Sequence, residues 1–170
     1  MNKKSSISSV FIYVISSLVI VIILYFGYKG ISGIYSARQE SLLETTKMQI
    51  KADFSQIALR FNNEANFEYQ LPSKFSKLCF LDLFVLEENR TLRDKELMNY
   101  PLIADSVTYN LTNNAFFVGD TIVPFDVGKI RVSCPPFFVC FEAKSGKIKF
   151  RVRGKGTYVL IANETNFCYS

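Results

Sequence analysis

The chain has 170 residues, of which 20 are Lys or Arg, 15 are Asp or Glu and none is His, so its formal net charge is +5. The absence of histidine excludes a histidine general base, a histidine metal ligand and a Ser-His-Asp or Cys-His centre. Lys3, Lys4 and Lys29 supply three of the positive charges and flank one apolar run. The remaining chain is nearly balanced, which does not indicate a globally basic nucleic-acid-binding domain.

The apolar run extends from Ile7 to Tyr28 and contains no charged residue. At about 1.5 Å per residue it is long enough, as a helix, to cross the roughly 30 Å hydrocarbon core of a bilayer. It is too long for the apolar part of a secretory signal peptide, and no A-x-A-like cleavage site follows it. The sequence therefore predicts one N-terminal membrane-spanning helix that stays attached.

The orientation of this span is predicted from both of its sides. Lys3 and Lys4 favour a cytoplasmic N-terminal tail by the positive-inside rule. The part after the span contains an even number of cysteines, suited to disulfides: Cys79, Cys134, Cys140 and Cys168. It also contains three N-x-[ST] glycosylation sequons, at Asn89, Asn110 and Asn163. We therefore expect a single-pass protein of the cell membrane whose C-terminal part is extracytoplasmic.

The segment from Ser36 to Asn63 has the pattern of an amphipathic helix without Gly or Pro. Its apolar residues recur at helical spacing and form one stripe: Leu43, Ile50, Phe54, Ile57 and Phe61. The Asn62-Asn63 pair is a plausible stop. Joined to the apolar run, the segment predicts one helix of roughly 55 residues, from Ser5 to Asn62.

After Phe67 the apolar period changes to two, which is typical of strands. Strands are predicted at 67–71, 77–85, 106–111, 115–118, 121–125, 129–133, 137–143, 147–153 and 157–162. The pair 137–143 and 147–153 is predicted to form a hairpin that turns at Lys144-Ser145-Gly146. Short strands at this spacing indicate a sandwich, for which an immunoglobulin-like arrangement is one option.

The predicted fold class is therefore α+β, with a long transmembrane and then amphipathic helix before an all-β sandwich-like ectodomain. The expected division has three parts. Residues 1–30 hold the tail and the transmembrane helix, residues 31–63 the amphipathic extension, and residues 64–170 the extracytoplasmic β-sandwich.

The four cysteines allow three disulfide pairings. A bridge between Cys79 and Cys140 is the first choice because both lie in strongly apolar strands, and it would leave Cys134 to pair with Cys168. The alternative closes Cys134 to Cys140 around two prolines and joins Cys79 to Cys168. A zinc site is not favoured, since no C-x₂₋₄-C pair occurs.

Four basic residues alternate along one predicted strand and so share one face: Lys147, Lys149, Arg151 and Arg153. One interpretation is a solvated outer face that discourages edge pairing. The other is a binding patch for an anionic surface or a glycan. No aromatic residue lies between them on that face, so specific nucleic-acid binding is not expected. No catalytic, cofactor-binding or metal-binding residue is predicted anywhere in the chain.

The N-terminal sequence Lys3-Lys4-Ser5-Ser6-Ile7-Ser8, a basic tail directly before an apolar helix, resembles the class III signal of type IV pilin-like proteins. Archaeal pilins and archaellum subunits are the most similar. The runs PSKFSKLCFLD and FFVCFEAKSGKIKFRVRGKGTYVLI resemble small archaeal membrane proteins with pilin-like anchors. The resemblance implies processing between Lys4 and Ser5, although Ser5 stands where the family usually has Gly or Ala. A plain signal anchor is the alternative.

The resemblance also implies a function. It implies a non-enzymatic, cofactor-free surface subunit that assembles through its apolar helix, in a membrane or a surface filament, and displays a disulfide-stapled β-domain. Its partners would be copies of itself or other envelope proteins. The alternatives are a monomeric membrane-anchored binding module and an accessory subunit of a membrane complex.

Overall fold

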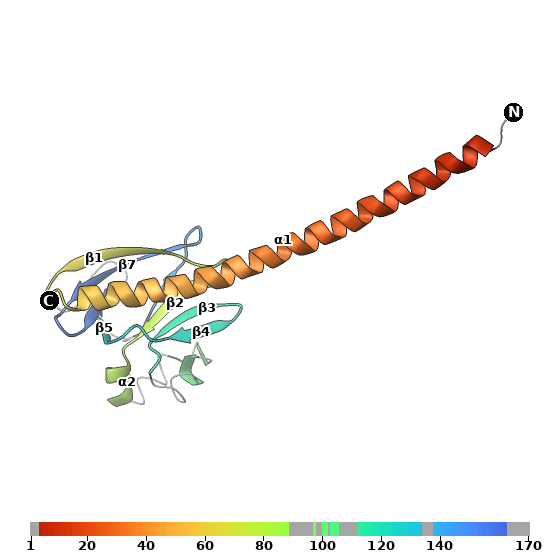
Figure 1. Cartoon of the computed structure of the whole chain (residues 1–170). Helices are drawn as coiled ribbons and strands as arrows, with labels where there is room; N and C mark the ends of the chain where they lie inside the picture. Colours follow the sequence, from red (N-terminus) through yellow and green to blue (C-terminus); the bar gives the residue numbers. More distant parts are fainter. Residues whose placement is uncertain are drawn as a thin grey trace. The chain divides into compact units, whose positions relative to one another are not determined.

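The structure, a computed structural model of the chain, describes residues 4–88, 97, 100–101, 103–105, 112–133 and 138–162, without the side chains of residues 4–10, 32 and 86–88. A long N-terminal helix precedes two mostly antiparallel β-sheets, which confirms the predicted α+β class and the sandwich-like β-domain. The helix α1 (Lys4–Ala58) has 55 residues and is the longest ribbon in Figure 1. The predicted strand at 106–111 lies outside the described residues.

The chain divides into two compact units, Met1–Glu40 and Ser41–Ser170. The sequence analysis placed the boundaries after residues 30 and 63, so that the amphipathic helix formed a part of its own. In the structure the boundary falls inside α1, because α1 from Leu43 onwards shares a core with the strands. We call residues 41–170 the β-domain, and residues 11–28, the described side chains of the predicted span, the apolar segment.

The strands form two four-stranded sheets. Sheet A has the order β1 (Glu64–Gln70), β7 (Lys147–Gly154), β8 (Val159–Ile161) and β5 (Ile130–Val132). Sheet B has the order β4 (Ile122–Phe125), β3 (Ala115–Gly119), β2 (Phe75–Leu81) and β6 (Phe138–Glu142). All neighbouring strands are antiparallel except β5 and β8, which are parallel. Because β1 pairs with β7 and β2 with β6, the sheets depend on long-range contacts.

The second half of α1 packs against both sheets (Figure 1). Phe54 is 1% exposed, and its ring stacks on Phe80 of β2 at a centroid distance of 5.5 Å. The same ring meets Phe150 of β7 edge-on at 6.1 Å, and Phe80 and Phe150 lie 5.2 Å apart. Aromatic pairs at such distances stabilise by about 0.5–1.5 kcal/mol beyond the area they bury. Phe54 therefore joins α1, sheet A and sheet B in one core.

Four residues of the predicted apolar stripe are buried: Leu43, Ile50, Phe54 and Ile57. The fifth assignment is wrong, because Phe61 is 77% exposed. It lies beyond the end of α1 at Ala58, so the helical spacing no longer applies to it. Asn62, which also lies beyond the end of α1, has a φ of 60°, a left-handed conformation that asparagine adopts more readily than most residues.

The end of α1 is bound to β7 at Gly154. The Asn62 amide donates to the Gly154 carbonyl at 2.7 Å, and the Gly154 amide donates to the Asn63 carbonyl at 2.9 Å. A Cβ atom at Gly154 would overlap the carbonyl oxygens of Ile57 and Arg60. Only glycine therefore allows β7 to approach the helix this closely.

The predicted hairpin is wrong beyond its turn. Ser145 (φ 54°) and Gly146 (φ 73°) form a two-residue turn in which the Lys144 and Lys147 backbones exchange hydrogen bonds of 2.8 and 3.1 Å. The flanking strands then separate, because β6 pairs with β2 in sheet B and β7 pairs with β1 and β8 in sheet A. The turn therefore connects the two sheets.

The predicted strand at 77–85 is too long. Strand β2 ends at Leu81, and α2 (Leu83–Glu88) follows it. Asp82 caps this helix, since its carboxylate accepts a hydrogen bond from the Val85 amide at 3.3 Å. The face of sheet B that points away from α1 is covered by a second apolar cluster, which includes Cys79, Leu81, Leu97, Ile103, Phe116 and Phe138. Strand β2 is thus buried on both faces.

Candidate functional sites

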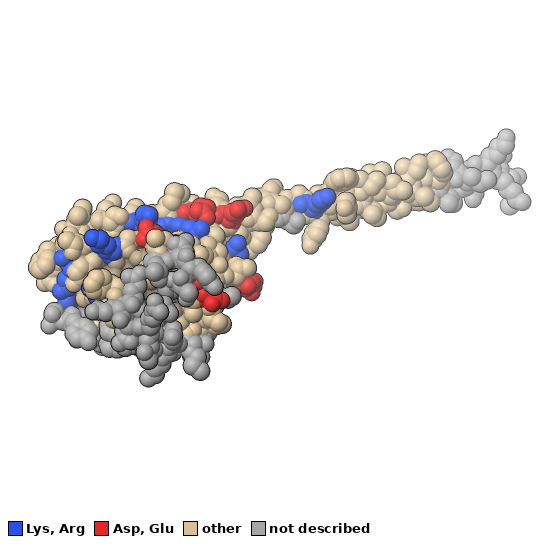
Figure 2. All heavy atoms as spheres, turned by 90° about the horizontal axis from the view of Figure 1, so that it is seen from below, with Lys and Arg blue, Asp and Glu red and all other residues tan. Residues whose placement is uncertain are grey.

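The apolar segment is exposed around its whole circumference. Its large apolar side chains, from Phe11 to Tyr28, are 45–78% exposed. It belongs to a helix that is long and apolar enough to cross a membrane. Figure 2 shows that charged side chains on the visible face gather mainly over the β-domain. Lys4 and Ser5, the predicted processing site, lie in the first turn of α1, and their side chains are not described.

A disulfide joins Cys79 to Cys140, the pairing that the sequence analysis placed first. The two residues are direct neighbours on β2 and β6, and Cys79 is completely buried. The bond therefore fixes sheet B across 61 residues of chain. Cys134 and Cys168, and the sequon residues Asn89, Asn110 and Asn163, lie outside the described residues.

The four basic residues of β7 face the acidic and polar residues of β1. Burial alternates along β7, with Lys147, Lys149 and Arg151 exposed and the intervening residues in the core. Glu68 of β1 binds Lys147 and Lys149, each at 2.8 Å. The sequence analysis missed this partner, although Glu64-x-Asn66-x-Glu68 alternates just as the basic residues do.

The remaining basic residues of β7 are paired as well. Arg151 donates to Asn66 at 3.1 Å, and Arg153 forms an ion pair with Glu64. We call this set of cross-strand contacts the charge ladder: Glu64, Asn66, Glu68, Lys147, Lys149, Arg151 and Arg153. Because Lys147, Lys149 and Arg153 pair with carboxylates of the same sheet, the ladder favours the solvated outer face over the anion-binding patch.

The ladder holds the pKa of Glu68 at about 2, well below its usual range. Hydrogen bonds from Lys147 and then Lys149 are the main causes, since both favour the charged carboxylate. Lys77 of β2 and Glu142 of β6 form a similar pair on sheet B at 2.9 Å. That contact raises the pKa of Lys77 and lowers the pKa of Glu142.

One carboxylate is buried beside β5. Asp82 is 1% exposed and accepts hydrogen bonds from the amides of Val85 and Val132. Arg131 lies 3.7 Å from it, and the guanidinium of Arg131 stacks over the Phe84 ring at 4.3 Å from the centroid. Burial raises the pKa of Asp82, while Arg131 and the backbone amides act to lower it.

A pocket of about 520 Å³ opens next to this pair, within the β-domain. Its walls come from four separate parts of the chain: residues 83–84, 112–114, 126–131 and 157–158. Its volume lies within the roughly 300–1,000 Å³ that is usual for small-molecule sites. We call it the β5 pocket.

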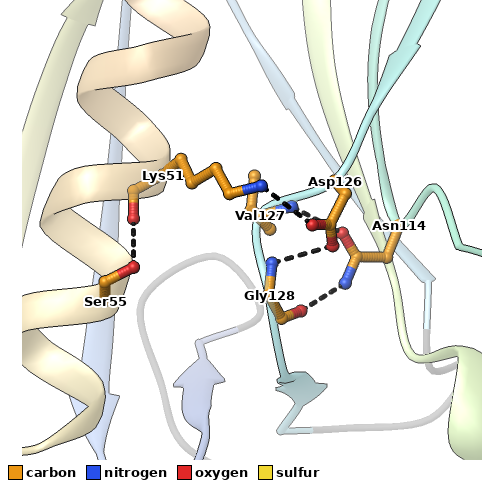
Figure 3. A network of polar contacts seen from close by, with 6 residues as sticks. All are labelled: Lys51, Ser55, Asn114, Asp126, Val127 and Gly128. Atoms are coloured by element: carbon orange, nitrogen blue, oxygen red, sulfur yellow. Dashed lines mark hydrogen bonds and ion pairs between the residues drawn. The ribbon is translucent and has the colours of Figure 1, made fainter.

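A polar network shapes one wall of the β5 pocket (Figure 3). The Asn114 side chain accepts from the Val127 amide at 3.1 Å and donates to the Gly128 carbonyl at 2.6 Å. Asp126 accepts from the Gly128 amide at 2.9 Å and binds Lys51 of α1 at 3.1 Å. These contacts hold the 126–128 loop in one conformation and fix Lys129 at the pocket.

The described residues offer no metal site, because no group of three or more Cys, Asp or Glu side chains lies together among them. No protein-family model, curated protein or solved structure matches the chain. The resemblance to archaeal pilins and archaellum subunits therefore stays a prediction. Function has to be argued from the residues of this chain.

Proposed function

We propose that the protein is a non-enzymatic, single-pass membrane protein that assembles through its apolar segment, as pilin-like subunits do, and displays the β-domain outside the cytoplasm. The observation that supports this most is the contrast along α1. The apolar segment has exposed apolar side chains all round, whereas the second half of α1 buries one stripe in the β-domain. Exposed apolar surface is unfavourable in water by about 25 cal/mol per Å². The segment therefore requires lipid or neighbouring helices.

Display of the β-domain follows from how α1 ends. Phe54 contacts both sheets, and Gly154 binds the backbone directly after the helix. The β-domain is thus attached to the second half of α1 by packing and hydrogen bonds, without a flexible linker. A force or contact at the β-domain would be transmitted to α1, which suits a subunit of an assembly.

The second candidate is a monomeric membrane-anchored binding module. The β5 pocket favours it, since a display subunit needs no pocket with cations and aromatic rings in its wall. In this case the apolar segment serves only as an anchor. The accessory-subunit alternative differs in that the span would bind one fixed membrane partner.

The test begins with the protein purified from its native membrane. Its intact mass and N-terminal sequence show whether processing occurs at Ser5, which pilin-like assembly predicts. Sedimentation in detergent then reports the number of copies per particle, and electron microscopy of sheared membrane fractions reports filaments.

The outcomes separate the candidates. Oligomers or filaments together with a start at Ser5 support assembly. A detergent-solubilised monomer that starts at Met1 and forms no filaments contradicts assembly and leaves the anchored module. Release of the protein from membranes by alkaline carbonate would contradict membrane anchoring itself.

A further inference from the structure

Two cationic residues line the β5 pocket. Lys129 lies directly before β5 and Arg131 lies in it, and both belong to the pocket wall. Ile130, between them, is 7% exposed and belongs to the core. The pocket wall therefore holds both cations beside an apolar residue of the core.

The charges in this wall do not balance. Asp126 is neutralised by Lys51 at 3.1 Å, and Arg131 lies 3.7 Å from Asp82. Among the described residues, no carboxylate lies within 4.0 Å of the Lys129 ammonium. The pocket thus has one cation without an acidic partner, which favours a ligand with one negative charge.

The rest of the wall includes an exposed aromatic ring and residues whose side chains carry hydroxyl groups. Phe84 is 65% exposed although it lines the pocket, so covering its ring would be favourable. Thr157 and Tyr158, whose side chains carry hydroxyl groups, line the pocket from the segment before β8. A sugar ring has an apolar C–H face and hydroxyl edges, which matches an aromatic ring next to hydroxyl groups better than a purely apolar ligand does.

We propose that the β5 pocket binds an acidic sugar of one or two rings. Lys129 binds its carboxylate, Phe84 covers the apolar face of a ring, and Thr157 and Tyr158 bind hydroxyl groups. Arg131 is held beside this site by Asp82 and Phe84. This site is independent of the proposed function, which concerns the apolar segment, so either can fail without the other.

The probe is D-glucuronate, titrated into the full chain by calorimetry in an uncharged polyoxyethylene detergent that contains no sugar. We expect saturable binding of one glucuronate per chain. Lys129→Gln should weaken it about tenfold, because a charge-assisted hydrogen bond is lost. Lys129→Arg should retain binding, and Phe84→Ala should weaken it by removing the ring.

The matched control is Lys144→Gln. Lys144 is exposed and lies outside the pocket, so this variant should bind glucuronate as the unaltered protein does.

Several results would overturn the proposal. The first is no glucuronate binding, and the second is equal binding by Lys129→Gln and the unaltered protein. Methyl glucoside, which is neutral, should bind more weakly, so equal affinity for it would show that the charge is not recognised. Tighter binding of benzoate would show a site for aromatic acids instead of sugars. Thermal unfolding of each variant verifies that its β-domain is folded.

Discussion

The two halves of α1 are both rich in apolar residues, but these residues serve different purposes. In the apolar segment, Phe26 is 66% exposed and has exposed apolar neighbours on every side. In the second half, Phe54 is 1% exposed and contacts three strands, while charged residues such as Lys47 and Lys51 remain outside the core. One helix therefore combines a surface that needs a partner with a surface that already has one.

The comparison shows that periodicity, and not the amount of apolar surface, separates the two roles. A stripe at helical spacing can be buried by one domain of the same chain. A segment that is apolar all round leaves most of its surface for lipid or other helices. Substitutions in the second half should therefore change folding of the β-domain, and substitutions in the apolar segment should leave that folding unchanged.

The largest expected effect is that of Phe54→Ala. Removing a buried phenylalanine usually lowers the free energy of unfolding by about 3–5 kcal/mol. Urea denaturation of the full chain in micelles, followed by tyrosine fluorescence, would measure the loss. The matched variant Phe26→Ala removes the same atoms from an exposed ring and should leave the free energy of unfolding of the β-domain unchanged. Equal losses in the two variants would disprove the division of roles.

The second effect concerns the membrane. Ile20→Lys places a charge in the middle of the apolar segment, where a lysine costs about 2.5–3.5 kcal/mol on insertion scales. We expect less protein in alkaline-washed membranes. The free energy of unfolding of the β-domain, measured by urea denaturation, should be unchanged. Met48→Lys is the control, because Met48 is 65% exposed on the second half of α1. A similar loss of membrane binding in Met48→Lys would contradict the assignment of the span.

The third variant tests the place where the second half of α1 ends. Gly154→Ala adds a Cβ that overlaps two backbone carbonyls, and such overpacking usually destabilises by about 1–3 kcal/mol. Gly27→Ala is its counterpart in the apolar segment, where a Cβ would meet nothing within 4 Å. There alanine should favour the helix by about 0.5–1 kcal/mol. Urea denaturation should show a lower free energy of unfolding for Gly154→Ala, and circular dichroism should show a higher helix content for Gly27→Ala. An unchanged free energy of unfolding in Gly154→Ala would mean that β7 can move away from the helix.

The features that the sequence predicts correctly are those that depend on local patterns. The spacing of Leu43, Ile50, Phe54 and Ile57 predicts the buried stripe because helical periodicity is a local property. Local patterns also place Cys79 and Cys140 in apolar strands and the turn at Ser145-Gly146. They do not reveal which sheet a strand joins, and β6 and β7 separate because Phe141 and Phe150 pack into the core from different sheets.

The β5 pocket was not predictable for the same reason. Phe84, Asn114, Lys129 and Tyr158 are far apart in sequence, and only the order of strands brings them together. The sequence analysis placed Asp82 inside a longer strand, so it did not predict that Asp82 caps α2 and lies beside Arg131. The partner of the basic residues was visible as an alternation of Glu64 and Glu68, but pairing of β1 with β7 follows from tertiary structure alone.

The smallest expected effect comes from the charge ladder, which lies on the face of sheet A opposite the core. The depressed pKa of Glu68 means that its contribution to stability is present above its unfolded pKa of about 4.5 and is lost as the pH falls toward 2. Glu68→Gln should therefore unfold somewhat more easily than the unaltered protein at pH 7, and the difference between them should shrink between pH 4.5 and 2. Glu44→Gln, which removes an exposed carboxylate that pairs with Lys47 on α1, leaves the two lysine contacts of Glu68 in place and should retain the acid-dependent loss. Urea denaturation across this pH range would measure the free energy of unfolding of both variants. If Glu68→Gln lowered this free energy as much as Phe54→Ala does, the outer face, and not the second half of α1, would dominate the stability of the β-domain.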